Sequence, residues 1–106
     1  MGSSSGGYGM TMEKLVETNY EIWSLEMNSY LLREGLWRLT TGVESVLKEP
    51  DTRDIDYKEL YKAWDAQQLR IERAIGILRG AMTHPMAKNY VGTIWNTPKR
   101  IWDDVQ

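Results

Sequence analysis

Residues 19–39 read NYEIWSLEMNSYLLREGLWRL, and this stretch decides the expected fold. It contains two apolar rows at helical spacing. The first row is Tyr20, Trp23, Met27, Tyr30 and Leu31, and the second is Ile22, Leu25, Leu32 and Leu36 around the small Ser29. A helix with one apolar row lies on a surface, so two rows predict a helix that is packed on two sides.

Residue types that start and stop helices flank these rows. Thr18 and Asn19 are good N-cap types, because a side-chain oxygen there can accept a bond from one of the first free backbone N–H groups. Gly35 can adopt the left-handed conformation that ends a helix, and Trp37 is expected to fold back onto the last turn. The spacing therefore predicts a helix over residues 19–35 at the centre of a small all-α domain.

Length and composition restrict the class of protein. The 106 residues allow one domain, and 42% hydrophobic with 26% charged residues is typical of a soluble globular chain. Five Trp and six Tyr occur with no Phe, which favours a core of amphipathic aromatic side chains. The net charge of −2 argues against a dedicated nucleic-acid binder, because such domains normally have a basic face.

Missing residue types exclude further kinds of site. The chain has no Cys, which excludes disulfides, thiolate catalysis and Cys-based zinc sites and is compatible with an intracellular, cytoplasmic location. No apolar run approaches the roughly 18 residues of a membrane span, and the start lacks the pattern of a secretory signal. Residues 1–12 are rich in Gly and Ser and are expected to be a flexible leader or the remnant of an expression vector, whereas residues 13–106 form the helical domain.

A loop and a long helix are predicted after residue 39. Residues 40–53 contain Gly42 and Pro50 and read as a connecting loop. One short helical turn is expected inside this loop, at Val43, Val46 and Leu47. The long helix is predicted over residues 56–79, with Asp54 or Asp56 as its cap. Its apolar side is expected to contain Tyr57, Leu60, Tyr61, Trp64, Ile71, Ile75 and Leu78.

Two shorter helices are predicted near the end of the chain. Gly80 ends the long helix, and residues 83–85 read as a turn. The next helix is expected over residues 86–95, with an apolar side of Met86, Tyr90, Val91 and Ile94. Thr97 as N-cap and Pro98 at the first position start the last helix, so Pro98→Ala is expected to be nearly neutral. The apolar residues of the last helix are Ile101, Trp102 and Val105, and more chain or a partner is expected to complete it.

Neither the carboxylates nor the histidine has a pattern typical of chemistry. Asp51, Asp54 and Asp56 lack the spacing and the glycine of an EF-hand, and they read as a loop followed by a helix cap. His84 is the sole histidine, and one histidine alone makes neither a triad nor a metal site. No catalytic residue, metal ligand or cofactor is therefore predicted, and an enzyme is not expected.

Three basic residues near the end are candidates for a small basic patch. These are Lys88, Lys99 and Arg100, but Asp103 and Asp104 follow them closely. Mixed charges of this kind are typical of an ordinary solvated surface.

Residues 15–39 resemble the opening of the Gag polyprotein of copia-type LTR retrotransposons. Members of that family typically begin with Leu, a few polar residues, Asn-Tyr, Trp, an aliphatic pair and then Gly-Leu-Trp. The matching residues here are Leu15, Asn19, Tyr20, Trp23, Met27, Leu31, Leu32, Gly35, Leu36 and Trp37.

The downstream half also looks similar to that family. Trp64-Asp65-Ala66 is followed by further members of the family's second helix pattern, here Ile71, Ala74, Ile75 and Leu78. Residues 97–103, which include Trp102, resemble its T-A-K-E-A/I-W-D helix start. Pro98 and Arg100 depart from that pattern, and Pro98 leaves the role as helix start intact.

The resemblance implies the N-terminal lobe of a capsid, a bundle of about four to five helices that assembles with copies of itself into a virus-like particle. The full-length protein is then a homo-oligomer, and the isolated lobe is a monomer or a weak dimer. In the family a zinc knuckle binds RNA; without Cys, RNA packaging is not expected of this chain alone. Tyr90 and Trp95 are candidate interface residues. Two alternatives remain, a domesticated Gag lobe that binds a protein or peptide partner, and a helical nucleic-acid binder.

Overall fold

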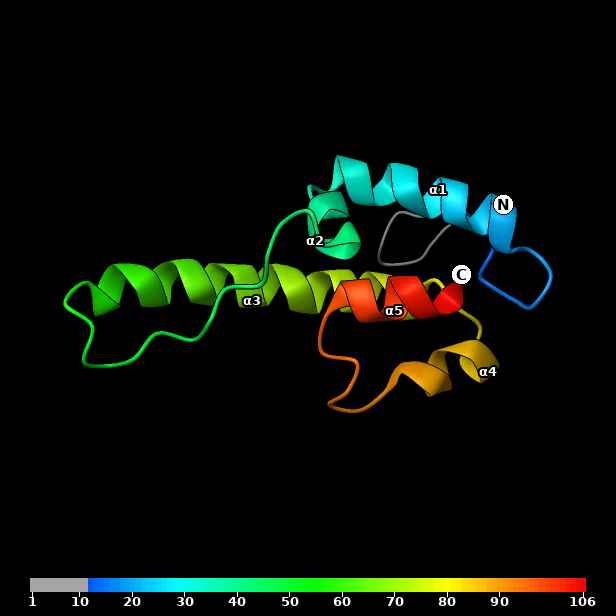
Figure 1. The fold of residues 1–106 in the computed structure, drawn as a ribbon. Coiled ribbons are helices and arrows are strands. Elements are labelled where there is room, and N and C mark those ends of the chain that lie inside the picture. The colour runs from blue at the N-terminus through cyan, green and yellow to red at the C-terminus, as the bar shows by residue number, and fades with distance from the viewer. Residues whose placement is uncertain (1–11) are drawn as a thin grey trace.

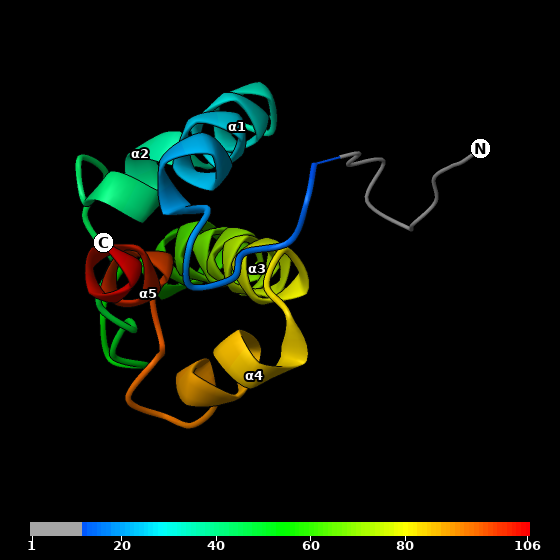
Figure 2. The ribbon, with the colours of Figure 1, turned by 90° about the vertical axis from the view of Figure 1, so that its right-hand side faces the viewer.

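The computed structural model describes residues 12–106, and in this part of the chain it confirms a small all-α bundle. The long helix α3 (Tyr57–Gly80) forms its axis (Figure 1). In the view along that axis, α1 (Tyr20–Arg33) and α2 (Trp37–Thr41) lie on one side of α3, and α4 (His84–Ala87) lies on the other (Figure 2). The last helix, α5 (Pro98–Val105), lies beside α3 and closes the bundle.

Tryptophans from three helices meet in the core. Trp23 of α1 stacks on Trp102 of α5 with ring centroids 5.9 Å apart, and Trp37 of α2 meets Trp102 edge-on at 5.3 Å. The indole N–H of Trp23 donates to the carbonyl of Ala81, so the polar edge of this ring is satisfied inside the bundle. The other buried hydrophobic residues are Leu15, Met27, Leu31, Leu36, Leu39, Ile71, Ala74, Ile77, Leu78, Ala81, Met82, Tyr90 and Ile101.

Only one of the two apolar rows on α1 is buried as predicted. Trp23, Met27 and Leu31 face the core, and Tyr20 and Tyr30 pack against it at partial exposure. In the second row, Ile22, Leu25 and Leu32 are 69%, 68% and 55% exposed. The expected packing on two sides is therefore wrong for these three residues. The reason is that α3, which is longer, takes the central position and leaves α1 on the outside of the bundle.

The end of α1 forms at the predicted glycine. Gly35 has φ +73°, and its N–H donates to the carbonyl of Leu32 at 3.2 Å, while the N–H of Leu36 donates to the carbonyl of Leu31 at 2.9 Å. These two bonds define a Schellman motif, in which an apolar pair normally covers the turn. Leu31 and Leu36 are both fully buried here. The motif turns the chain inward and directs Leu36, the last member of the second row, into the core.

Asn19 precedes α1 but its side chain does not cap the helix. Its Oδ1 accepts a hydrogen bond from the N–H of Val16 at 2.8 Å, and its Nδ2 donates to the carbonyl of Lys14 at 3.0 Å. The side chain therefore points back along the chain and fixes residues 12–19, the lead-in to α1. The predicted cap bond is wrong because these two preceding backbone groups occupy both ends of the amide.

The lead-in is bound to the far end of α3. Leu15 pairs with Met82 in a parallel β-bridge, through bonds from the N–H of Leu15 to the carbonyl of Ala81 and from the N–H of Thr83 to the carbonyl of Leu15. Leu15 is buried, whereas Val16 is 39% exposed. The expected leader falls largely on residues 1–11, which lie outside the described residues.

The long helix has almost the predicted limits, but its two halves differ. The first buried residue of α3 is Gln67, and the half before it contributes nothing to the core. Trp64, which the sequence places in the core, is only partly buried and lies outside the core cluster. The preceding loop contains no helical turn, and its apolar residues Val43, Val46 and Leu47 are exposed. Asp56 lies at the N-cap position of α3 but makes no side-chain bond to the helix.

The helix expected over residues 86–95 begins earlier and is shorter. It starts at His84 as α4, continues as the 3-10 helix η1 (Lys88–Tyr90) and ends at Val91, whose backbone is extended. Gly92 then turns the chain with φ +121°. Val91 and Ile94 are consequently exposed instead of forming an apolar helix side.

The last helix starts as predicted. The hydroxyl oxygen of Thr97 accepts a bond from the N–H of Arg100, Pro98 follows the cap, and Ile101 and Trp102 are buried. Pro98 is itself fully buried. Replacing it by Ala removes one or two methylene groups from the core. The variant should therefore lower the free energy of unfolding by about 1 kcal/mol. The neutral effect expected from the helix position alone did not take this burial into account.

Candidate functional site

The three polar groups singled out in the sequence do not form a reactive site. Asp51 is paired with Arg53, Lys99 is paired with Asp103, and His84 is exposed. No group of three or more His, Cys, Asp or Glu side chains within residues 12–106 is arranged to hold a metal ion. No helix in the same range is both long enough and apolar enough to cross a membrane. The candidates that remain are apolar surfaces.

Tyr90 and Trp95, the candidate interface pair, form an internal contact. Tyr90 is 5% exposed, its ring meets Trp95 edge-on at 4.9 Å, and its hydroxyl donates to Asp104 at 2.9 Å. Burial, followed by the neighbouring Asp104 carboxylate, raises the pKa of Tyr90 to about 12. The pair therefore connects the segment after η1 to α5, so little of Tyr90 is left at the surface, and Trp95 is partly buried.

The first apolar surface lies on the outward face of α1. Its members, here called the outer row, are Ile22, Leu25, Ser29 and Leu32. Their spacing of three, four and three places them on one face, opposite the buried row. The hydroxyl of Ser29 donates to the carbonyl of Leu25 within the helix, so it leaves no free donor in the row. The outer row is thus an almost wholly apolar stripe, with Glu21 and Glu26 on its two sides.

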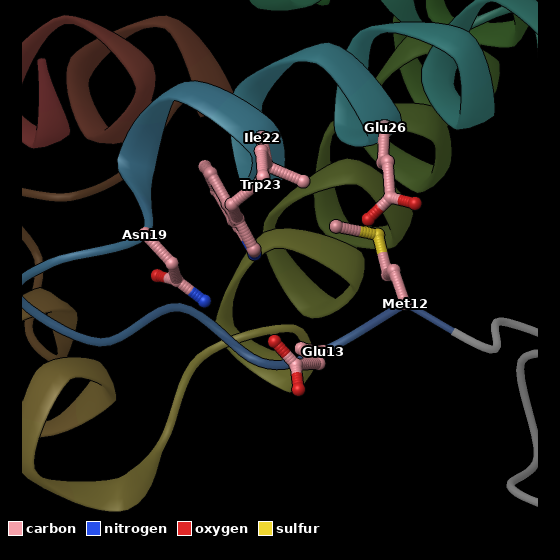
Figure 3. A pocket seen from close by; sticks show the side chains of 6 residues that line it. All are labelled: Met12, Glu13, Asn19, Ile22, Trp23 and Glu26. Atoms are coloured by element: carbon pink, nitrogen blue, oxygen red, sulfur yellow. The ribbon is translucent and has the colours of Figure 1, made fainter.

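A hollow of about 240 Å³ extends the outer row toward the lead-in. Figure 3 shows its lining, in which Met12 and Glu13 of the lead-in face residues of α1. The lining residues are Met12, Glu13, Asn19, Ile22, Trp23 and Glu26. Ile22 belongs to both the hollow and the outer row, so the two features form one continuous surface.

The second apolar surface lies on the first half of α3. Residues 57–66, here called the α3 arm, extend beyond the other helices (Figure 1). Tyr57 and Tyr61 have ring centroids 5.8 Å apart, and Tyr61 and Trp64 are 5.5 Å apart, so the three rings form an aromatic ladder along the arm. Tyr61 and Leu60 are each 41% exposed. The apolar side predicted for this helix therefore exists, but half of it faces solvent instead of the core.

Gln67 fixes the loop before α3, and no sequence pattern singled it out. The residue is 4% exposed, accepts from the N–H of Leu47 at 2.8 Å, and donates to the carbonyl of Ser45 at 2.8 Å and to Glu44 at 3.0 Å. All polar ends of this buried amide are therefore used. One signal was available, because Gln67 lies between Trp64 and Ile71 at helical spacing, on the side that should be apolar.

Glu44 connects this loop to a second residue of α3. Its carboxylate accepts two bonds from Arg70, at 2.8 and 3.0 Å. Hydrogen bonds from Arg70 first, and from Gln67 second, hold the pKa of Glu44 below its usual value of 4.5. Arg70 also donates to the carbonyl of Gly35 at 2.9 Å. The network joins the end of α1, the loop and α3 at one point.

A groove lies between the fixed loop and the α3 arm. It has a volume of about 650 Å³. Its lining residues are Leu47, Lys48, Glu49, Pro50, Asp51, Asp54, Leu60 and Ala63. Apolar side chains come from both the loop and the helix, and the charged ones come from the loop alone. Such a groove can accept an extended segment with apolar side chains.

Comparisons of the chain with protein-family models, with curated proteins and with solved structures find no match. Its own surfaces and its sequence patterns are therefore the basis for a functional argument. Two of these surfaces are apolar, lie on separate helices and face solvent: the outer row of α1 and the aromatic ladder of the α3 arm.

Proposed function

We propose that this chain is a structural lobe of the Gag capsid type, which associates with copies of itself through the surfaces of its helices. The main support is that two apolar surfaces, the outer row and the aromatic ladder, are exposed on different helices. A subunit with two distinct contact surfaces can extend an assembly in more than one direction, whereas a single self-complementary surface closes at a dimer. Burial of apolar area stabilises each contact by roughly 25 cal/mol per Å².

The resemblance to copia-type Gag supports the capsid class within this proposal. The residues that carry the resemblance have structural roles here: Trp23 and Trp102 stack in the core, and Gly35 and Leu36 form the turn after α1. Such residues meet a requirement of the fold. Function then depends on the exposed surfaces that this fold presents.

Self-association is tested most directly by placing a charge in the outer row. We expect the apparent mass of the wild-type protein in sedimentation velocity to rise between micromolar and millimolar concentration at low salt. Leu25→Glu, at a position 68% exposed, should suppress this rise without unfolding the chain. Ala66→Glu is the matched control, because Ala66 is exposed on α3 on the side opposite the ladder.

Two results would count against this proposed function. The first is a wild-type protein that stays monomeric over the whole concentration range and forms no particles in electron micrographs under crowded, low-salt conditions. The second is equal suppression by Leu25→Glu and by Ala66→Glu, which would trace the effect to net charge instead of the outer row.

A second candidate function is the binding of a peptide from another protein, and it rests on the groove of about 650 Å³ beside the α3 arm. A peptide array separates the two functions, because one specific sequence bound with micromolar affinity is not expected of a plain shell component. Leu60→Glu, in the apolar part of the groove, should then abolish peptide binding. Uniformly weak binding across the array would exclude this function.

A further inference from the structure

We propose that a second copy of this chain docks on the α3 arm in antiparallel orientation, with Tyr61 at the two-fold axis. This inference rests on the proposed self-association and names one of its contact surfaces. The α3 arm is suited to a partner because it is helical without contributing to the core: the first buried residue of α3 is Gln67. Isolated helical segments of this length are marginal in water, so packing against a second helix would stabilise the arm.

The aromatic ladder lies on a side of the arm that the preceding loop leaves open. The loop lines the groove together with Leu60 and Ala63 and is bound by Gln67, and the spacing of these three residues defines one side of the helix. Tyr57, Tyr61 and Trp64 follow one another at four and three residues and define a neighbouring side. An approaching helix can therefore reach the ladder without displacing the loop.

The spacing of the ladder is self-complementary. In an antiparallel pair of identical helices related by a two-fold axis, each residue faces the one at the same distance on the other side of the axis. With Tyr61 on the axis, the two Tyr61 rings meet each other. Tyr57 of each copy then lies opposite Trp64 of the second copy, to within one residue. Aromatic rings of this kind pack favourably edge-to-face or offset.

The charges beside the ladder complement one another in the same arrangement. Lys58 and Asp65 are seven residues apart, so they lie along the same edge of the ladder, and both are exposed. Neither takes part in an ion pair within residues 12–106. Like edges meet in an antiparallel two-fold pair, which places Lys58 of each copy against Asp65 of the second copy. This charge complementarity favours a second copy over an unrelated partner.

Charge reversal tests this pairing in the full chain. Lys58→Glu replaces both attractive contacts by repulsive ones, as does Asp65→Lys, so each variant alone should dimerise roughly tenfold more weakly at low salt in sedimentation equilibrium. An equal mixture of the two variants should restore association, because each mixed pair regains both opposite charges. The double variant should recover it as well. Glu59→Lys, an exposed residue on the side of the arm opposite the ladder, is the matched control.

A cross-link tests the position of the axis independently. The chain has no Cys, so Tyr61→Cys introduces a single thiol that meets its own copy at the axis. Mild oxidation should then yield a covalent dimer in good yield. Ala66→Cys, exposed on the opposite side of α3, should not. Circular dichroism of both variants establishes that the helices are intact.

The outcomes separate this inference from the proposed function. A wild-type chain that associates, combined with no effect of the charge reversals and no selective cross-link at Tyr61, would overturn the antiparallel pairing and leave self-association in place. A chain that remains monomeric at all concentrations would overturn both. Recovery in the mixture together with a selective Tyr61→Cys dimer supports the pairing.

Discussion

The indole N–H of Trp23 donates a hydrogen bond of 2.9 Å to the carbonyl of Ala81 inside the bundle. The same carbonyl accepts the N–H of Leu15 at 2.8 Å. One acceptor just after α3 therefore holds both the first turn of α1 and the lead-in before it. Because Trp23 also stacks on Trp102, this ring is positioned by polar and apolar contacts at once.

Trp23→Ala should lower the free energy of unfolding by about 3–5 kcal/mol, because it leaves a large cavity among α1, α3 and α5. Trp23→Phe should cost less, about 1–2 kcal/mol, since most of the apolar contact remains and only the hydrogen bond and part of the ring are lost. Urea unfolding followed by circular dichroism measures both. Equal losses in the two variants would show that the hydrogen bond, and not the packing, dominates.

Gly35→Ala and Gly76→Ala should act in opposite directions. At neither glycine does a neighbouring atom lie within 4 Å of the position that a Cβ would occupy, so space does not decide the outcome. Gly35 has φ +73°, where Ala is strained by about 1–2 kcal/mol. Gly76 lies inside α3, where Ala should stabilise by roughly 0.5–1 kcal/mol. Thermal unfolding checks both signs, and destabilisation by Gly76→Ala would contradict the open surroundings of that residue.

Glu44→Gln should flatten the dependence of stability on acid pH. The pKa of Glu44 is lowered in the folded state by hydrogen bonds from Arg70 and Gln67, so its contribution is present above the usual value of 4.5 and is lost as the pH falls through the lower folded-state pKa. At neutral pH the variant should lose at most about 1 kcal/mol, as is typical of partly exposed ion pairs. Urea titrations in acid and at neutral pH measure this difference. If the free energy of unfolding depended on acid pH as steeply in the variant as in the wild-type protein, the role of the Glu44 network would be contradicted.

Tyr90→Phe should remove part of the alkaline loss of stability. The pKa of Tyr90 is raised from 10.0 to about 12, so its contribution is complete below pH 10 and is lost as the pH rises through about 12. At neutral pH the variant should cost about 1 kcal/mol through the lost hydrogen bond to Asp104. The free energy of unfolding, measured for both proteins at several pH values between 10 and about 12, tests whether the wild-type protein loses more stability than the variant. A wild-type protein no more sensitive to alkali than Tyr90→Phe would contradict the burial of this phenol.

Local signals in the sequence were sufficient for most helix limits. These signals act through backbone conformation or through a bond to a near neighbour. The structure has helix ends at or next to the residues that carry them, which are Gly35, Gly80 and the Thr97-Pro98 pair. Local signals do not determine which side of α1 faces the core. Both of its rows have helical spacing, and only the position of α3, set by contacts far along the chain, determines that Ile22 and Leu25 remain outside.

The candidate surfaces were harder to predict than the helices. An apolar side on the first half of α3 was expected. Its exposure depends on how far the other helices extend along α3, and a local sequence pattern does not predict that. Gln67 is similar, because its amide is satisfied by Ser45 and Leu47 from a loop without regular structure. Asn19 was assigned to the wrong neighbour, since a cap type can bond backward to Val16 as readily as forward into the helix.

The bridge between Leu15 and Met82 has a consequence for the order of events during synthesis. Leu15 leaves the ribosome early, but its backbone partners at Ala81 and Thr83 follow only after the whole of α3 has been made. Trp102, which stacks on Trp23, emerges later still. The nascent chain therefore exposes the apolar residues of α1 until α5 is available, and chaperones have that interval in which to bind them.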